Sequence, residues 1–288
     1  MVNICASSHP LSFTSVRNAP IAAALLVASF SSAFAQQLNT NEPVSIAIAN
    51  EPPFTELKPD GTLTGSGPDV DIAILKEAGF TQFKGEVMKY GAMIPALQAS
   101  RVKMVSSGGL AIRPERCQQV IFSEPVTCGS TGFLVRPEMA GKFDSYAKAA
   151  ELGVKIGVIA GGLQEKDALA RGVKRENAVV FPDQASAIKM LADRRIDAIA
   201  LADYSLEKMK QLSGDPSLQI VVPLKDVEVF CAAAAFRKDD TALRDAYNSG
   251  LKKLRESGKF DKILVSYGMG PRLPLIKNAP STVAACGK

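Results

Sequence analysis

The sequence predicts an α/β fold of two lobes, in which each lobe is a mostly parallel sheet flanked by helices and the chain crosses between the lobes twice. Short apolar strand patterns alternate with helical patterns early in the chain, which is typical of parallel β-α-β units with right-handed crossovers. The same alternation starts again in the middle of the chain. Two long extended segments, residues 122–137 and 229–236, are expected to form the two crossings.

The first unit carries clear strand, turn and helix signals. Residues 42–50 alternate apolar and smaller side chains, as a strand does, and Lys-Pro-Asp-Gly at 58–61 predicts a hairpin turn. A helix is expected to open at Pro68 and Asp69, because proline has no N–H to lose in a first turn and Asp faces the positive helix end. Gly79 ends it. Further strands are expected at 83–88 and 104–107, with a helix at 91–100 and a Gly-rich loop after the second of these strands.

The second unit and the end of the chain give the remaining elements. We expect lobe 1 to contain residues 36–130 and 236–288, and lobe 2 to contain 131–235. The tail after Gly270 holds three prolines and is expected to be loosely attached. Between these limits we expect a helix opening at 143–146, strands at 154–159, 178–181, 196–201 and 220–222, and helices at 164–171, 186–193, 205–212, 240–257 and 260–267.

The N-terminus reads as an export signal over residues 1–35. Arg17 precedes an apolar run that is too short to span a bilayer, and Ala33-Phe34-Ala35 supplies a small-x-small cleavage pattern. An uncleaved anchor helix is the alternative, and a start codon later than Met1 is also open. With cleavage near Ala35, the mature protein is expected to be periplasmic.

Composition excludes several classes of function. A net charge of +5 over 288 residues, without a dense basic run, gives no support to nucleic-acid binding. There is no phosphate loop, no nucleophile elbow and no CxxC motif, and the single histidine, His9, lies in the predicted signal. We therefore expect no cofactor and no metal. Export makes disulfides permissible, and Cys117, Cys128, Cys231 and Cys286 allow three full pairings between which the sequence does not choose.

Three predicted loops follow strands and are expected to meet at one edge, where open α/β sheets bind ligands. In the second loop, Arg116 follows the Gly-rich segment at 108–109, and its guanidinium could grip a carboxylate bidentately. Backbone groups near Gly109 and Ala111 would assist. The alternatives are a surface arginine at a helix start, or an ion pair with Glu115 or Glu124.

The first loop could hold a cation. Glu51 would supply the negative charge, and Phe54 and Tyr90 would stack on the cation, a contact worth ~0.5–2 kcal/mol. The alternative is a solvated Glu51 beside core aromatics.

In the third loop, Gly161 and Gly162 offer free N–H groups at a helix start, or simply make a turn. Leu163 and Gln164 follow them toward the same cleft. Asp203, just after a buried strand, could be a second acid for an ammonium or the N-cap of the next helix.

Six stretches carry a resemblance to a known family over residues 42–270. They are EPPF, GPDVDIAILKEAG, YGAMIPALQ, RPERCQQVIFSEP, AGGLQEK and LKKLRESGKFDKILVSYG. In this order and spacing the chain resembles the periplasmic solute-binding proteins of ABC importers, the type II polar amino-acid family. It looks most like the ectoine- and hydroxyectoine-binding branch, because of EPPF, the Cys after RPER and the second Cys after FSEPV.

The resemblance implies a monomer whose two lobes close on a small zwitterion and then dock on a membrane permease. It places Arg116 on the ligand carboxylate, and Glu51, Phe54 and Tyr90 on the acid and aromatics of the site. Gly109 and Ala111 fall on the loop that donates backbone contacts, and Gly161 to Gln164 on the loop of the second lobe. The resemblance also implies a binding protein and not an enzyme.

The chain departs from the family pattern at four positions. Ala111 stands where amino-acid binders carry Thr and ectoine binders an aromatic, and Leu163 replaces a small hydroxyl residue. The usual ammonium-binding Asp falls near Ala202, one place before Asp203, and Lys103 stands where Asp is common. These departures make a bulkier or more apolar ligand plausible.

Cys128 and Cys231 fall at the starts of the two crossings, so the resemblance suggests a disulfide there. Cys117 with Cys128 is the alternative, and Cys286 is expected to be free. Two other functions remain open. Cyclohexadienyl dehydratases resemble these binders, and Glu165 would be the acid of such an enzyme. The sensor lobe of a receptor is disfavoured, because no membrane-spanning pattern follows.

Overall fold

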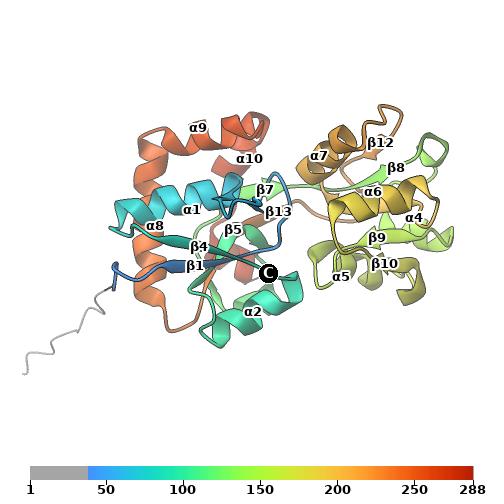
Figure 1. The fold of residues 1–288 in the computed structure, drawn as a ribbon. Helices are drawn as coiled ribbons and strands as arrows, with labels where there is room; N and C mark the ends of the chain where they lie inside the picture. Colours follow the sequence, from blue (N-terminus) through green and yellow to red (C-terminus); the bar gives the residue numbers. More distant parts are fainter. Residues whose placement is uncertain (1–37, 288) are drawn as a thin grey trace, which may run out of the picture. The chain divides into compact units, whose positions relative to one another are not determined.

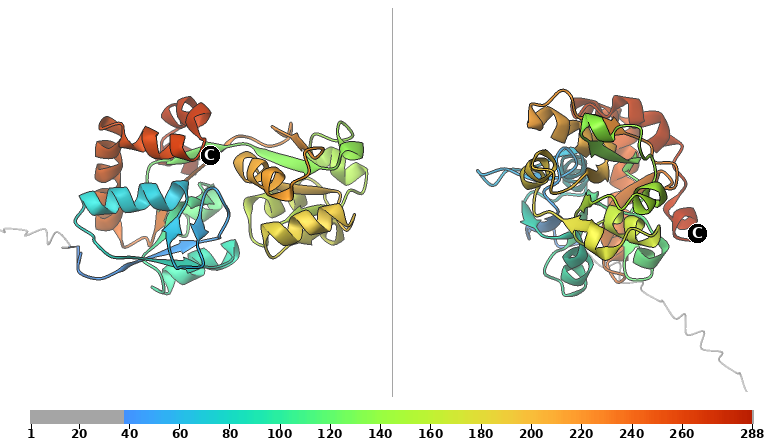
Figure 2. Two further views of the ribbon diagram at one scale, coloured as in Figure 1. Left: turned by 45° about the horizontal axis from the view of Figure 1, so that its top comes forward. Right: turned by 90° about the vertical axis from the view of Figure 1, so that its right-hand side faces the viewer.

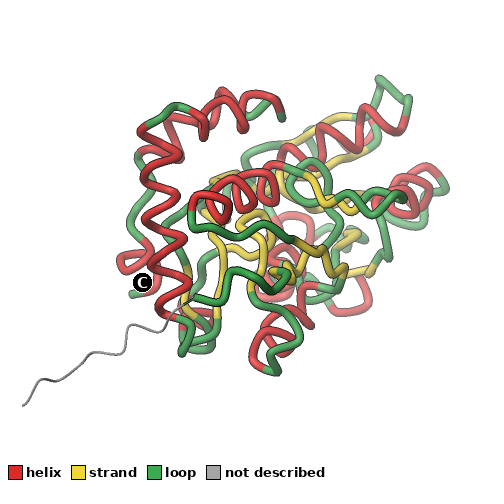
Figure 3. The backbone as a smooth tube through the Cα atoms, turned by 60° about the vertical axis from the view of Figure 1, so that its left-hand side comes forward, coloured by secondary structure: helices red, strands yellow, loops and turns green. Residues whose placement is uncertain are grey.

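The computed structural model describes residues 38–287 (Figure 1). The predicted signal peptide and its cleavage site lie outside the described residues. Within that range, no helix combines the length and apolar character needed to cross a membrane. The fold consists of two large sheets, each covered by helices on both faces, and a short two-stranded sheet, and Figure 3 shows the strands enclosed by these helices.

The first sheet has the order β4-β1-β5-β13-β6, with β7 also paired to β13. β1 is parallel to β4 and β5, whereas β13 runs antiparallel to β5, β6 and β7. The strands are β1 (Val44–Ile48), β4 (Phe83–Val87), β5 (Met104–Ala111), β6 (Ile121–Phe122), β7 (Thr127–Gly129) and β13 (Phe230–Phe236).

Two cores lie on opposite faces of this sheet. One holds apolar side chains of α1 (Ser66–Glu77), α8 (Thr241–Glu256) and α9 (Lys259–Ser266), and the other holds those of α2 (Tyr90–Gln98). The hairpin predicted around the turn at 58–61 is confirmed as β2 (Glu56–Leu57) and β3 (Leu63–Thr64). The Gly-rich segment at 108–109 was expected to be a loop, which was wrong: β5 continues through it to Ala111.

The second sheet has the order β10-β9-β11-β8-β12. β9, β10 and β11 are parallel, β8 runs antiparallel to β11, and β12 runs antiparallel to β8. The strands are β8 (Thr131–Val135), β9 (Ile156–Val158), β10 (Ala178–Val180), β11 (Ala198–Ala202) and β12 (Gln219–Val221). One face is covered by α4 (Tyr146–Glu151) and α5 (Leu163–Ala170), and the other by α6 (Gln184–Ala192) and α7 (Asp203–Ser213). The predicted α/β class is confirmed, with both sheets mixed.

The chain changes sheet twice. It passes from β7 into β8 across Ser130 alone, and it returns between β12 and β13. β7 and β13 lie side by side at the crossings (Figure 2), and Cys128 is the register partner of Cys231. These two cysteines form a disulfide, as predicted. The predicted boundary at residue 235 falls within β13, a strand of the first sheet; the lobe limits stay a prediction.

The C-terminal segment corrects two expectations. It was expected to be loose, but it forms η3 (Gly270–Arg272), α10 (Leu273–Lys277) and α11 (Thr282–Cys286). Cys286, expected to be free, forms a disulfide with Cys117 at the end of α3 (Pro114–Cys117), so the alternative pairing of Cys117 with Cys128 was also wrong. The three prolines of this segment indicated a loose tail. Proline is well tolerated in the first turn of a helix, however, and two of the three occupy that position in η3 and α10. Two further 3-10 turns are η1 (Pro137–Met139) and η2 (Arg175–Asn177).

Candidate ligand-binding site

A small cavity of about 40 Å³ brings together residues that follow β1 and end β5 with residues of α5 and β11. Most of the predicted site residues line it. They are Glu51, Phe54, Tyr90, Gly109, Ala111, Arg116, Leu163 and Gln164. Five further lining residues were not predicted, namely Gly108, Thr127, Ala202, Phe230 and Ala232.

Arg116 is a buried cation whose guanidinium lacks a carboxylate. Its side chain lies in the short α3, and the residue is 5% exposed. Nη1 donates a hydrogen bond to the backbone oxygen of Ala111 at 2.9 Å. None of the ion pairs formed within residues 38–287 involves Arg116, and Glu115 instead contacts Lys166 at 3.9 Å. Burial lowers the pKa of Arg116 because the charge is desolvated. A ligand carboxylate would accept hydrogen bonds from the N–H groups of this buried guanidinium and would neutralise its charge.

Glu51 supplies the acid of the cavity and is 6% exposed. Oε2 accepts a hydrogen bond from the Tyr90 hydroxyl at 2.6 Å, and Oε1 accepts one from the Ser205 hydroxyl at 2.6 Å. Burial raises the pKa of Glu51, and the two hydrogen bonds act in the opposite direction. Ser205 belongs to α7, which packs on the second sheet. The Glu51 carboxylate therefore links the loop after β1 of the first sheet to α7. Sequence reasoning missed Ser205, although it lies in the first turn after a buried strand.

Aromatic rings form three parts of the cavity wall. Phe54 follows β1, Tyr90 begins α2, and Phe230 begins β13. Burial raises the pKa of Tyr90 well above its ordinary value, and the neighbouring Glu51 carboxylate adds to the shift. The Tyr90 hydroxyl therefore stays protonated and remains a hydrogen-bond donor to Glu51. Ring faces of this kind attract cations.

A buried network holds β5 in place at Ser106 and Ser107. The Asp71 carboxylate accepts hydrogen bonds from the Ser106 hydroxyl at 2.7 Å, from the Ser107 N–H at 3.1 Å and from the Tyr247 hydroxyl at 2.5 Å. Burial raises the pKa of Asp71 to about 6. The backbone also approaches closely here, because a Cβ on Gly108 would lie 2.9 Å from the Phe54 oxygen. Only glycine fits at Gly108, and it brings the strand against the first loop.

Three predicted site residues do not line the cavity. Asp203 pairs with Arg272 and accepts backbone hydrogen bonds from Ser130 at 3.2 Å and Tyr204 at 2.9 Å. The Gly161 N–H donates to the Glu165 carboxylate at 2.6 Å. Gly162 is the N-cap of α5.

Glu165 was the acid of the enzymatic alternative. Its carboxylate contacts Arg175 at 2.6 Å and lies outside the cavity lining. It is therefore engaged as a structural ion pair.

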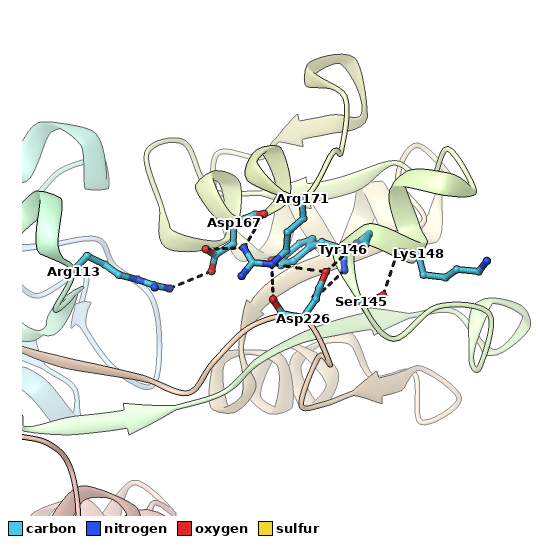
Figure 4. Close-up of polar contacts among 8 residues, drawn as sticks. Arg113, Ser145, Tyr146, Lys148, Asp167, Arg171 and Asp226 are labelled. Carbon is cyan, nitrogen blue, oxygen red and sulfur yellow. Dashed lines mark hydrogen bonds and ion pairs between the residues drawn. The ribbon is translucent and has the colours of Figure 1, made fainter. Parts of the chain in front are cut away.

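A second polar link joins the two sheets beside the cavity (Figure 4). Arg113 Nη2 lies 3.4 Å from Asp167 Oδ2 on α5. The other oxygen of Asp167 contacts Arg171 Nη1 at 3.3 Å, and Arg171 Nε donates to the backbone oxygen of Asp226 at 2.5 Å. The Asp226 carboxylate in turn accepts the N–H of Tyr146, at 3.1 Å, at the start of α4. Arg113 is thus linked, through these contacts, to α5 and to the start of α4 in the second lobe.

The fold is that of a type II periplasmic binding protein, a class of two-lobed proteins that bind small solutes. The model of "Bacterial extracellular solute-binding proteins, family 3" matches residues 44–270, and the chain belongs to this family. The similar proteins reported below are binding proteins, and this chain is a binding protein and not an enzyme.

Several known proteins are similar to this chain. A probable amino-acid ABC transporter periplasmic-binding protein, y4tE of Sinorhizobium fredii, is 34% identical over 236 residues, covering 79% of this chain and 77% of the relative. The L-arginine-binding protein of Pseudomonas aeruginosa is 29% identical over 233 residues, covering 79% and 88%. Among solved structures, EhuB in complex with hydroxyectoine is 39% identical with a TM-score of 0.80, covering 84% of this chain and 93% of that one.

Proposed function

We propose that this chain is the substrate-binding component of an ABC importer, which captures a small zwitterion in the periplasm between two closing lobes. The observation that carries the proposal is the buried guanidinium of Arg116, which lines a cavity and has no carboxylate partner within residues 38–287. A buried cation of this kind is costly unless an anion neutralises it. The ligand carboxylate takes that role, through paired N–H groups of Arg116.

The cationic end of the ligand lies against Glu51 and the rings of Phe54 and Tyr90. These groups line the same cavity as Arg116, so both ends of one small molecule can be bound at once. Gly109 and Ala111 add contacts from β5, and Leu163 and Gln164 close the site from α5. The hydrogen bond between Ser205 and Glu51 supports closure, because it joins α7 of one lobe to the loop after β1 of the other.

Two ligand types fit this description, and an ectoine-like compound fits better than a polar amino acid. EhuB, which is 39% identical, was solved with hydroxyectoine, whereas other relatives are named as arginine or histidine binders at lower identity. Each oxygen of Glu51 already accepts one hydrogen bond, and Asp203 is paired with Arg272 outside the cavity. That arrangement favours a delocalised cation with few N–H groups, which the rings can hold, over a primary ammonium.

Export of the chain and docking of the closed form on a membrane permease complete the proposal. The name of the Sinorhizobium fredii relative and the family's description as extracellular support both steps. We expect the protein to work as a monomer.

Isothermal titration calorimetry with ectoine, hydroxyectoine, L-arginine and L-histidine tests the proposal. We expect the wild type to bind at least one of them, most tightly an ectoine, and Arg116→Ala to keep its circular dichroism spectrum but lose measurable binding. Arg101→Ala, which removes an exposed arginine, is the control and should bind as the wild type does. Unchanged affinity in Arg116→Ala would show that the carboxylate is bound elsewhere.

A further inference from the structure

We propose that Phe230 determines which ligands the cavity accepts, because its ring is the partition between the cavity and a second, larger one. The proposal rests on the proposed function, in that it takes the cavity lined by Glu51 and Arg116 as the ligand site. Nothing in the sequence pointed to Phe230, which lies in an extended segment followed by Cys231 and four alanines.

The register of β13 places Phe230 on the floor of the cavity. Ala232 lies opposite Ala111 of β5, and both line the cavity. Because side chains alternate along a strand, Phe230 and Ala232 point to the same face. Ala111 and Ala232 are small, so Phe230 is the large side chain that β13 contributes to this floor.

On its other side, β13 pairs with β7, and Phe230 is opposite Gly129. A Cβ at Gly129 would lie 3.3 Å from Cζ of the Phe230 ring, which shows that the ring lies across that glycine. The adjacent disulfide between Cys231 and Cys128 fastens the backbone at this point. Because the backbone of β13 is held here, the boundary of the cavity at this point depends on the Phe230 side chain.

Phe230 also lines a second cavity, of about 400 Å³ compared with about 40 Å³ for the first. Ile112, Leu275 and Pro280 give the second cavity an apolar lining, and Arg113 and Asn278 add polar groups. Among residues 38–287, Phe230 is the one residue shared by the two linings, which is why we assign its ring as the partition between a tight polar site and a roomier, more apolar space. With the ring present, the ligand must be a compact zwitterion. Without it, the site would accept a zwitterion that carries an apolar extension.

Phe230→Ala tests this inference, with Val229→Ala as the matched control. Val229 is the neighbouring residue and lines the second cavity but not the first, with 48% of its surface exposed. Calorimetry would use two pairs of probes: ectoine with a homologue that carries propyl in place of the ring methyl group, and L-arginine with Nω-propyl-L-arginine. Phe230→Leu keeps most of the volume without the aromatic face.

We expect Phe230→Ala to bind the compact probe about tenfold more weakly and to raise the affinity of the propyl compound relative to its parent by about tenfold or more. Phe230→Leu should lose affinity for the compact probe without gaining the propyl compound. Val229→Ala should behave as the wild type. An unchanged ratio between homologue and parent in Phe230→Ala would overturn the inference.

A crystal structure of Phe230→Ala decides the same point without a ligand. One continuous cavity is the expected result, and two cavities that stay separate would overturn the inference. If the wild type binds neither ectoine nor L-arginine, the proposed ligand class fails, whereas the structure of the variant still shows whether Phe230 is the partition. Circular dichroism and thermal unfolding of each variant establish that it is folded.

Discussion

The Ser205 hydroxyl donates a hydrogen bond to Glu51 Oε1 at 2.6 Å, although the two residues are 154 positions apart and lie in α7 and in the loop after β1, which pack on different sheets. The other oxygen of the same carboxylate is held by Tyr90. One buried acid therefore both lines the cavity and connects its two sides. Ligand capture and lobe closure should depend on it together.

Ser205→Ala should weaken ligand binding by about tenfold, because a hydrogen bond to a charged group contributes about 1.5–3 kcal/mol. The loss falls on the closed form, in which α7 meets the loop after β1. Calorimetry with the tightest ligand of the panel measures it. Ser266→Ala removes an exposed serine that donates only to the Ile263 backbone, and it should have no effect on affinity. Equal affinities for the two variants would refute the bridging role.

Arg113→Ala should reduce affinity about threefold, because it removes the ion pair to Asp167, which is only partly shielded from water. The effect should shrink as salt concentration rises. A double-mutant cycle with Asp167→Asn isolates the pair from the contact between Asp167 and Arg171. Lys148→Ala, which breaks an exposed pair within α4, is the control. A coupling free energy of zero in the cycle would mean that the pair does not favour closure.

Asp203→Ala should lower stability while leaving affinity nearly unchanged. The residue is 5% exposed and pairs with Arg272, but it does not line the cavity. Losing that pair and the hydrogen bond from Ser130 should lower the thermal midpoint by about 5 °C. Asp193→Ala, which breaks an exposed pair with Lys189, should lower it little. If instead binding is lost at unchanged stability, Asp203 acts directly on the ligand.

The free energy of unfolding that Asp71 contributes should decrease as pH rises from about 4 to about 7. Burial raises its pKa from 3.8 to about 6, so the folded state holds the proton more tightly than the unfolded chain does. The resulting stability is fully present below pH 3.8 and is lost as pH rises through about 6. Urea unfolding across this range should show wild-type stability declining by about 3 kcal/mol relative to Asp71→Asn. Parallel curves for the two proteins would show that Asp71 does not hold the proton.

Much of the fold followed from local pattern. The alternation at 42–50 and the turn at 58–61 marked β1 and the hairpin, and the apolar run at 196–201 marked β11. Such signals depend on near neighbours in sequence, and they are strong because burial repeats with the period of the element. The disulfide between Cys117 and Cys286 was missed because pairing across 169 positions depends on the tertiary fold.

Residues of the site were predictable where they lie in a loop that follows a parallel strand. They were missed where they come from a strand or helix that is distant in sequence. Arg116 and Glu51 belong to the first kind. Phe230 and Ser205 belong to the second, because only the pairing of β13 with β5 and the packing of α7 bring them to the cavity. Asp203 was placed at the cavity because it follows a buried strand, and its ion pair with Arg272 was missed because Arg272 lies in a segment that was expected to be loose.

The disulfide from Cys286 ends on the residue directly after Arg116. The segment that carries Arg116, the arginine proposed to bind the ligand carboxylate, is thus joined covalently to α11, the last helix that the structure describes, which has no residue in the cavity lining. Proteolytic removal of the C-terminal helix would therefore be expected to weaken ligand binding. On the proposed function, a protein that had lost only α11 would keep nearly the same size and circular dichroism spectrum and would still bind its ligand less well.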